Sequence, residues 1–230
     1  MKNIVFKSAL FLSSLVVSHV SVANGIGIFG LHNPTSPEQH QVVLKQIKHN
    51  EQMRDCNLLR HGKTNGAQGN LNVAENNHYF MLECPTTILS LAGISKTLES
   101  INKNTRNLML LEGNFSDINR EGLSQDSSKR AYILKISHFN NKQPAQRTRE
   151  LAAFKKEAYA LDNHYYREAF INVQHAYGVK RPDELAIIYY DTQESGDKFR
   201  QNNPKFIEKI GQFNMKHLTE FTYIFASANN

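Results

Sequence analysis

The sequence contains no tryptophan, only two cysteines and, beyond its N-terminal segment, no apolar run long enough to span a membrane. It also lacks the glycine-rich phosphate-binding loop, the Gly-x-Ser-x-Gly nucleophile elbow and the His-Glu-x-x-His zinc motif. The commonest hydrolase and metalloprotease signatures are therefore missing. This lowers the expectation of an enzyme without excluding one, because many secreted nucleases and lipid hydrolases have no local signature. No internal repeat or low-complexity tract is evident in the sequence.

The excess of basic residues is small. The chain carries a formal net charge of +6, and without Lys2 and Lys7 the remaining 25 basic and 21 acidic residues leave +4. A dedicated nucleic-acid-binding protein concentrates far more positive charge along one stripe, so nucleic acid is not indicated as a partner. A mild positive balance suits contact with a protein or with an anionic envelope component such as lipopolysaccharide or phospholipid.

Residues 1–23 have the pattern of a secretory signal peptide. Two lysines precede an apolar run, Ala9 to Val22, and small residues lead up to a cleavage site after Ala23. The pattern predicts an exported protein, either periplasmic or secreted. Residues 24–35 are rich in glycine and are expected to form an extended lead-in to a single α+β domain over residues 36–230.

Cys56 and Cys84 are expected to form a disulfide bond, because an even pair of cysteines in an oxidising compartment usually does so. Such a bond would stabilise the fold by about 3 to 4 kcal/mol by restricting the unfolded chain. The alternative is a free, nucleophilic Cys84 placed between a strand and the start of a helix. The phosphatase pattern of a cysteine followed six residues later by arginine fails, because position 90 is Ser.

Hydrophobic periodicity predicts several helices and strands. Helical spacing marks residues 37–60, 85–103 and 204–217, and alternation or apolar content marks strands at 78–84, 107–115, 129–139, 184–190 and 221–226. Ser36 is the expected N-cap of the first helix. Neither Gly nor Pro occurs between Pro144 and Gly178, which predicts one long helix near 145–177. The order of elements indicates an α+β protein, in which a mixed sheet of about five strands is packed by three or four helices.

The triplet Arg60-His61-Gly62 resembles the opening signature of the histidine phosphatase family. In that family the histidine receives the phosphoryl group and the arginine binds its oxygens. The resemblance therefore implies a phosphomonoesterase that uses His61, with Arg130 as a loose match to the second arginine of the family. The alternative, favoured by the helical pattern upstream, is that Arg60 and His61 form the last turn of a helix closed by Gly62.

A second candidate site lies on the expected long helix. If residues 145–177 are helical, one narrow stripe of the helix surface carries Glu157, His164, Glu168 and His175. One helical turn separates His164 from Glu168, so the two could share a divalent metal ion or a proton. Further ligands would come from His138 or Asp191 in the sheet. The alternative interpretation is a stripe of ion pairs along the border of an amphipathic helix.

These patterns favour an exported protein that works by binding a protein or an anionic envelope partner. The alternative is a secreted, metal-assisted hydrolase with His164, Glu168 and His175 as catalytic residues and Glu157 as an added metal ligand. A weaker alternative is the phosphomonoesterase that uses His61.

Overall fold

Eight strands in the described part of the chain form a closed antiparallel barrel in the order β1-β3-β2-β8-β5-β7-β6-β4. The computed structural model describes residues 25–34, 36–51, 53–73, 75–85, 91, 94–96, 98 and 108–229. The strands are β1 (Ile26–His32), β2 (Asn57–Gly69), β3 (His78–Cys84), β4 (Met109–Ile118), β5 (Ala131–Phe139), β6 (Tyr166–Tyr177), β7 (Glu184–Tyr190) and β8 (Leu218–Asn229). The prediction of a mixed sheet of about five strands packed by three or four helices is therefore wrong.

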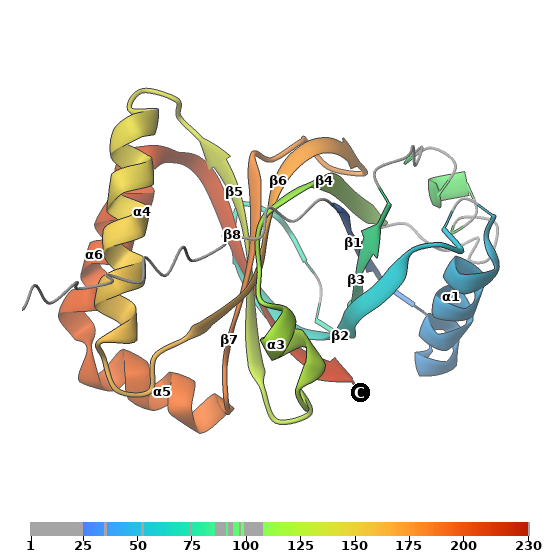
Figure 1. Ribbon diagram of the computed structural model, residues 1–230, viewed down its shortest axis with the longest axis horizontal. Coiled ribbons are helices and arrows are strands. Elements are labelled where there is room, and N and C mark those ends of the chain that lie inside the picture. The colour runs from blue at the N-terminus through green and yellow to red at the C-terminus, as the bar shows by residue number, and fades with distance from the viewer. Residues whose placement is uncertain are drawn as a thin grey trace, which may run out of the picture.

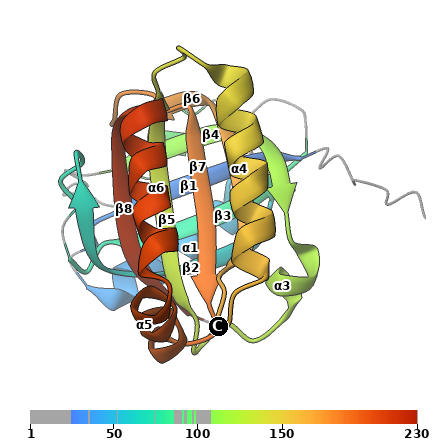
Figure 2. The same cartoon turned by 90° about the vertical axis from the view of Figure 1, so that its left-hand side faces the viewer.

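Helices cover the outside of the barrel on two opposite sides (Figure 1). On these two sides lie α1 (Pro37–His49) and the group of α4 (Pro144–Tyr159), α5 (Gln193–Asn202) and α6 (Pro204–His217), whereas the short α3 (Arg120–Ser124) lies between the two sides in this view. The pair α4 and α6 lies side by side on one face, whereas α1 lies on the far side, as both views show (Figure 2). Within the described residues, no helix is long and apolar enough to cross a membrane.

The two halves of the barrel have the same topology. Each half runs strand, helix, strand, strand, helical segment, strand, if the helical residues 91, 94–96 and 98 are counted between β3 and β4 and the two helices α5 and α6 together form that segment in the second half. Within each half the fourth strand pairs with the first, the first with the third, and the third with the second. The pairs β2–β8 and β4–β6 then join the halves into one barrel. The structure thus contains a repeat that the sequence does not reveal.

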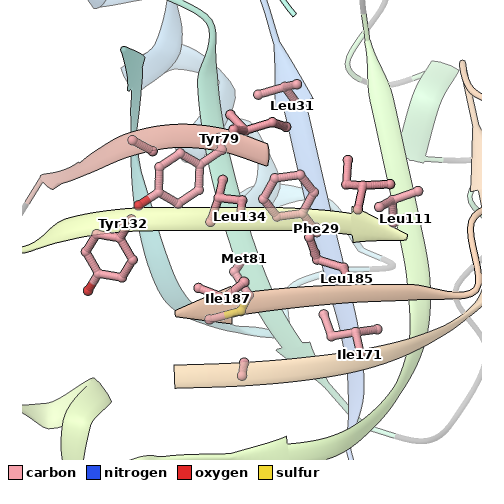
Figure 3. Packing of buried hydrophobic residues seen from close by; sticks show 14 of the residues in the cluster. Phe29, Leu31, Tyr79, Met81, Leu111, Tyr132, Leu134, Ile171, Leu185 and Ile187 are labelled. Atoms are coloured by element: carbon pink, nitrogen blue, oxygen red, sulfur yellow. The ribbon is translucent and has the colours of Figure 1, made fainter. Parts of the chain in front are cut away.

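Alternating strand residues fill the barrel with apolar side chains (Figure 3). In β5, Tyr132, Leu134 and Ile136 point inward, as the alternation of that segment predicts. Strand β3 is buried on both faces, because Tyr79 and Met81 face the barrel while Phe80 packs outward beneath α1. This double burial explains why residues 78–84 are almost continuously apolar.

Both long helices expected from the sequence end early. The N-cap prediction is confirmed, because the Ser36 side chain accepts a hydrogen bond from the Gln39 amide, but α1 ends at His49. The segment 57–69 is strand β2 and not the end of a helix. The expected helix 145–177 ends at Tyr159, and Asn163 then takes a positive φ of 55° before β6 begins at Tyr166.

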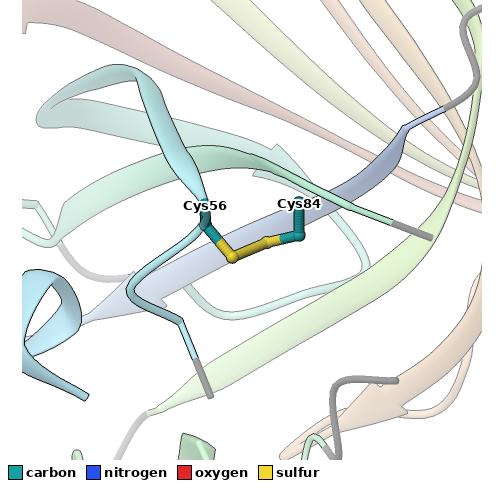
Figure 4. Close-up of a disulfide and its surroundings, with 2 residues drawn as sticks. All are labelled: Cys56 and Cys84. Carbon is teal, nitrogen blue, oxygen red and sulfur yellow. A yellow bond between two sulfur atoms is a disulfide. The ribbon is translucent and has the colours of Figure 1, made fainter. Parts of the chain in front are cut away.

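A disulfide bond joins Cys56, just before β2, to Cys84 at the end of β3 (Figure 4). No free cysteine remains in the part of the chain that the structure describes. The bond therefore fastens two neighbouring strands at one end of the barrel.

The expected signal peptide, residues 1–23, lies outside the described residues and stays a prediction. The expected lead-in is largely β1, which pairs with β3 on one side and with β4 on the other. This segment is thus part of the barrel.

Candidate functional site

A buried ion pair crosses the inside of the barrel between two strands that are not neighbours. Arg60 of β2 donates through Nε to Oε1 of Glu168 at 3.2 Å and through Nη2 to Oε2 at 3.0 Å. Glu168 lies on β6, which belongs to the other half of the chain. The Glu168 side chain is fully buried and that of Arg60 is 7% exposed. Two parallel hydrogen bonds of this kind fix both charge and orientation.

Two residues from β5 and its approach complete the cluster. The Tyr132 hydroxyl donates to Oε2 of Glu168 at 3.0 Å, and Arg130 Nη1 lies 3.5 Å from the same oxygen. The Arg130 guanidinium also stacks over the Tyr189 ring, 4.0 Å from its centre. We call Arg60, Arg130, Tyr132 and Glu168 the barrel cluster.

Irregularities in the strands aim both members of the central ion pair inward. The pairing of β2 with β3 shifts between Leu58 and Arg60, and the pairing of β6 with β7 shifts between Arg167 and Ala169. Glu168 is therefore the extra residue of a β-bulge, which lets it and Ala169 both be buried. Bulges re-aim side chains in this way and are frequent next to active sites.

The short helix α3 and the loop after it cover the barrel cluster. Arg60 donates to the Ser127 hydroxyl at 2.7 Å and to the Leu123 carbonyl at 3.4 Å. Arg130 donates to the Gly122 carbonyl at 2.8 Å and to the Gln125 side chain at 2.9 Å. All four acceptors are neutral oxygens, so a negatively charged oxygen would be a stronger partner for either guanidinium.

The barrel cluster carries one net positive charge, because two guanidiniums face one carboxylate. Burial alone would lower the pKa of Arg60, but the hydrogen bond and charge of Glu168 raise it above the usual value. Burial, together with the Glu168 carboxylate, raises the pKa of Tyr132 far above its ordinary range. Burial likewise raises the pKa of Tyr79, whose hydroxyl has no hydrogen-bond partner among the described residues. Both tyrosines therefore stay protonated and available as hydrogen-bond donors.

The four residues of the expected helix stripe do not meet. Glu157 is on α4 and pairs with Lys209. His164 lies in the turn before β6, where its ring packs against two tyrosines. His175 is exposed on β6, opposite Glu112. Only Glu168 is in the barrel cluster. As the described side chains stand, no group of three or more His, Cys, Asp or Glu residues is arranged to hold a metal ion.

His138 and Asp191 do not join Glu168 either. His138, at the end of β5, lies 3.8 Å from the Glu220 carboxylate of β8. Asp191 follows β7 and is exposed, while the N-cap of α5 is Thr192 and not Asp191. Neither residue is therefore positioned to supply a further ligand beside Glu168.

Arg60 and His61 point to opposite sides of the barrel wall. Arg60 enters the barrel, whereas the His61 ring lies outside, with Nδ1 3.4 Å from Nε2 of His40 on α1. Arg130 is on the inside, so His61 and Arg130 do not share a phosphate pocket. Gly62 does not close a helix; its Cα is so close to the Ser227 carbonyl oxygen that an added Cβ would be 1.9 Å away. The resemblance to the histidine phosphatases is therefore limited to the sequence Arg60-His61-Gly62 and does not extend to the structure.

His61 belongs to a group of four histidines on the outer face of the N-terminal half. Burial lowers the pKa of His32 to about 4 and that of His40 to about 3, with the charge of His78 as a further cause. Burial also lowers the pKa values of His61 and His78, assisted by Arg60 for His61 and by Lys63 for His78. The four imidazoles are consequently neutral at neutral pH.

The barrel is similar to solved structures of three kinds. An anthrone oxidase-like protein aligns with a TM-score of 0.57 at 8% identity, covering 90% of this chain and 92% of that one. A candidate monooxygenase from Lactobacillus acidophilus NCFM gives 0.51 at 9% identity, with 90% and 95% covered. A variant of chlorite dismutase from Candidatus Nitrospira defluvii gives 0.54 at 11% identity, with 90% and 92% covered. These likenesses establish the fold. No family model and no curated protein matches the chain.

The comparisons correct the expected function. Proteins described as anthrone oxidase-like, as a candidate monooxygenase and as chlorite dismutase share this barrel, so the comparisons favour an enzyme fold and do not support the expected binding protein. The metal-assisted hydrolase has no structural basis, because Glu157, His164, Glu168 and His175 do not meet. The phosphatase has none either, because His61 and Arg130 do not share a pocket. The comparisons lend no support to a signal peptide, a periplasmic location or secretion, and export stays a prediction from the N-terminal segment alone.

The sequence indicates Glu168 as part of a helix stripe, whereas the structure places it on strand β6. It indicates Arg60 only as the neighbour of His61. Tyr132 was recognised as a strand residue and Arg130 only as a loose motif match. One signal was available: Arg60 directly follows two leucines, and Glu168 directly precedes an apolar stretch that begins at Ala169. Without knowledge that β2 and β6 face each other across a barrel, nothing linked the two.

Proposed function

We propose that this chain is an oxidoreductase that binds a small organic substrate at the barrel cluster. The substrate carries an anionic oxygen or an enolisable carbonyl group. The observation that carries the proposal is the buried pairing of Glu168 with Arg60 and Arg130, which both halves of the chain build at one end of the barrel. A cluster of two guanidiniums, one carboxylate and a protonated tyrosine can bind an oxyanion and move a proton.

Each residue has a distinct role in this proposal. Arg60 and Arg130 bind the substrate oxygen in place of the neutral acceptors of α3 and its loop. Glu168 accepts the proton that the substrate loses, and the Tyr132 hydroxyl orients the Glu168 carboxylate through its hydrogen bond to Oε2. A substrate with an activated methylene group would then react with O₂ and yield a carbonyl group and water, which balances the overall reaction.

The named neighbours support this substrate class. An anthrone carries a methylene group activated by two aromatic rings, and its deprotonated form places negative charge on oxygen. The similarity to an anthrone oxidase-like protein and to candidate monooxygenases therefore agrees with a site built to stabilise an anionic oxygen. The two neighbours are 8% and 9% identical to this chain, and their similarity supports the choice of anthrone as the test substrate.

The test uses anthrone as the probe. Oxygen consumption and formation of the quinone are measured with the wild type, with Glu168→Gln and with Glu157→Gln, a matched change at a partly exposed carboxylate outside the barrel. We expect turnover by the wild type and by Glu157→Gln, and a loss of about 100-fold or more in Glu168→Gln, the usual effect of removing a general base.

A binding measurement accompanies the assay. Bound anthrone should ionise in the wild type, which its visible absorbance reports, and Arg60→Lys should weaken this signal because lysine cannot make the paired hydrogen bonds. Absence of both turnover and ionisation with anthrone and related phenols would overturn the proposal. Equal activity of Glu168→Gln and Glu157→Gln would do so as well.

A further inference from the structure

Four histidines from four different elements gather on the outer face of the N-terminal half, beneath α1. His32 ends β1, His78 begins β3, and the two are direct neighbours in the strand pairing. His40 comes from α1 and His61 from β2. Three of these side chains, His32, His40 and His78, are buried. The barrel cluster does not involve them, so they require a separate explanation.

Hydrogen bonds link the rings of His32, His40 and His61, and only a small shift separates the His32–His40 nitrogen pair from the spacing of two nitrogens on one metal ion. His32 Nε2 is 2.9 Å from His40 Nδ1, and His40 Nε2 is 3.4 Å from His61 Nδ1. Two nitrogens bound to one tetrahedral zinc ion, each at about 2.05 Å, are about 3.3 Å apart. Nδ1 of His78 is buried and has no hydrogen-bond partner among the described residues, which is rare for a buried polar atom.

The spacing of the rings agrees with a three-histidine site. The ring centres are 5.1 Å apart for His32 and His40, 4.3 Å for His40 and His78, and 6.3 Å for His32 and His78. Three imidazoles on one tetrahedral ion would have centres about 5 Å apart. His32 and His40 already face each other, so His78 is the ring that has to turn. This explains why no complete ligand set exists as the side chains stand.

We propose that His32, His40 and His78 bind a divalent transition-metal ion of the Zn²⁺, Cu²⁺ and Ni²⁺ class, which imidazole ligands favour over Mg²⁺ and Ca²⁺. His32 binds through Nε2 and His40 through Nδ1. The remaining Nε2–H of His40 is donated to His61, the kind of outer hydrogen bond that orients metal-binding imidazoles. The ion ties α1 to β1 and β3, and this site does not depend on the function proposed for the barrel cluster.

Cobalt(II) and zinc provide the test, with the untagged chain. The wild type should take up one Co²⁺ per chain, with the strong visible absorption of tetrahedral cobalt, and Zn²⁺ should displace it. His40→Gln and His78→Gln should each weaken binding at least ten-fold, and His61→Gln by less. His49→Gln, a matched change at an exposed histidine of α1, should bind like the wild type.

A second measurement covers the case in which the variants fail to fold. In the wild type, zinc should shift the ring-nitrogen resonances of His32, His40 and His78 while those of His49 and His175 stay unchanged, and it should raise the melting temperature. No uptake by the wild type, or shifts at His49 and His175 alone, would overturn the proposal. Equal uptake by folded His40→Gln and His49→Gln would overturn it as well.

Discussion

Arg60 and Glu168 are 108 residues apart in the sequence, yet two hydrogen bonds of 3.2 and 3.0 Å join their side chains inside the barrel. The strands that carry them, β2 and β6, do not pair with each other. The contact is therefore made across the barrel, and it forms only when both halves are folded and closed.

Replacing Glu168 should destabilise the protein strongly. Glu168→Gln would leave the buried Arg60 and Arg130 guanidiniums without their counter-charge, and breaking one partner of a buried pair costs about 3 to 5 kcal/mol. Glu157→Gln removes a carboxylate that pairs with Lys209 at the surface, so we expect a loss of about 1 kcal/mol or less. Urea unfolding measures both, and similar losses in the two variants would contradict this assignment.

Lys135 should make the stability depend on pH in the alkaline range. Burial lowers its pKa to about 8, while the unfolded chain keeps the usual value of 10.5. Between these two pH values the unfolded state binds more protons, so this residue makes the fold more stable as the pH rises. Lys135→Met should therefore be more stable than the wild type by about 1 to 3 kcal/mol below pH 8.

That advantage should shrink as the pH rises from 8 towards 10. Thermal or urea unfolding of Lys135→Met and the wild type over this range measures the difference directly. Lys205→Met, at an exposed position of α6, is the control and should show no such trend. A constant difference between Lys135→Met and the wild type at all pH values would argue against a buried, charged Lys135.

Two glycine substitutions should have opposite effects. In Gly62→Ala the new Cβ would meet the Ser227 carbonyl oxygen at 1.9 Å, where β2 pairs with β8, so we expect a loss of about 3 kcal/mol or more. In Gly211→Ala the added methyl group meets no atom within 4 Å and replaces glycine inside α6. This change should stabilise the protein by about 0.5 to 1 kcal/mol.

Urea unfolding of the two alanine variants distinguishes the barrel from the interpretation of residues 60–62 as a helix end. A helix-capping glycine with positive φ would lose about 1 kcal/mol on substitution. A loss of that size at Gly62 would count against its close approach to β8.

Reduction of the disulfide bond should lower the free energy of unfolding. The bond closes a loop with a sequence separation of 28 between Cys56 and Cys84, for which the chain-entropy account gives about 3 to 4 kcal/mol. Urea unfolding with and without reductant measures the difference. The double variant Cys56→Ser/Cys84→Ser should be equally stable under both conditions, and an equal shift of variant and wild type would show that the reductant acts elsewhere.

The sequence predicts the boundaries of a helix or strand best where the local pattern of apolar residues is strong. The strand prediction at 78–84 coincides with β3, the one at 184–190 with β7, and the helix 204–217 with α6. Strands β3 and β7 are short segments that are almost continuously apolar, and α6 carries its apolar residues at helical spacing after Pro204. The barrel itself could not be inferred, because closure depends on which strand edges meet, and no local pattern encodes that pairing.

Two strands were missed for identifiable physical reasons. In β2 the sequence Asn57–Gly69 is polar and rich in glycine, because its inward positions hold Arg60 rather than a run of apolar side chains. In β6 the bulge at Glu168 breaks the alternation that would have marked a strand. With neither Gly nor Pro after Pro144, the helical period of α4 then appeared to continue through Asn163. The four-residue stripe was the result, and only Glu168 of that stripe is in the barrel cluster.

The strand pairs β2–β8 and β4–β6, which join the two halves, also leave the barrel without exposed strand edges among the described residues. Exposed strand edges recruit other chains and start aggregation, and a closed barrel removes them. In the part of the chain that the structure describes, every strand has a neighbour on both sides. A cut between β4 and β5 would let the halves separate, and each half would then expose two edges. The described part of the chain therefore supplies a partner for each of its strand edges, which leaves no edge open for edge-to-edge pairing with another copy.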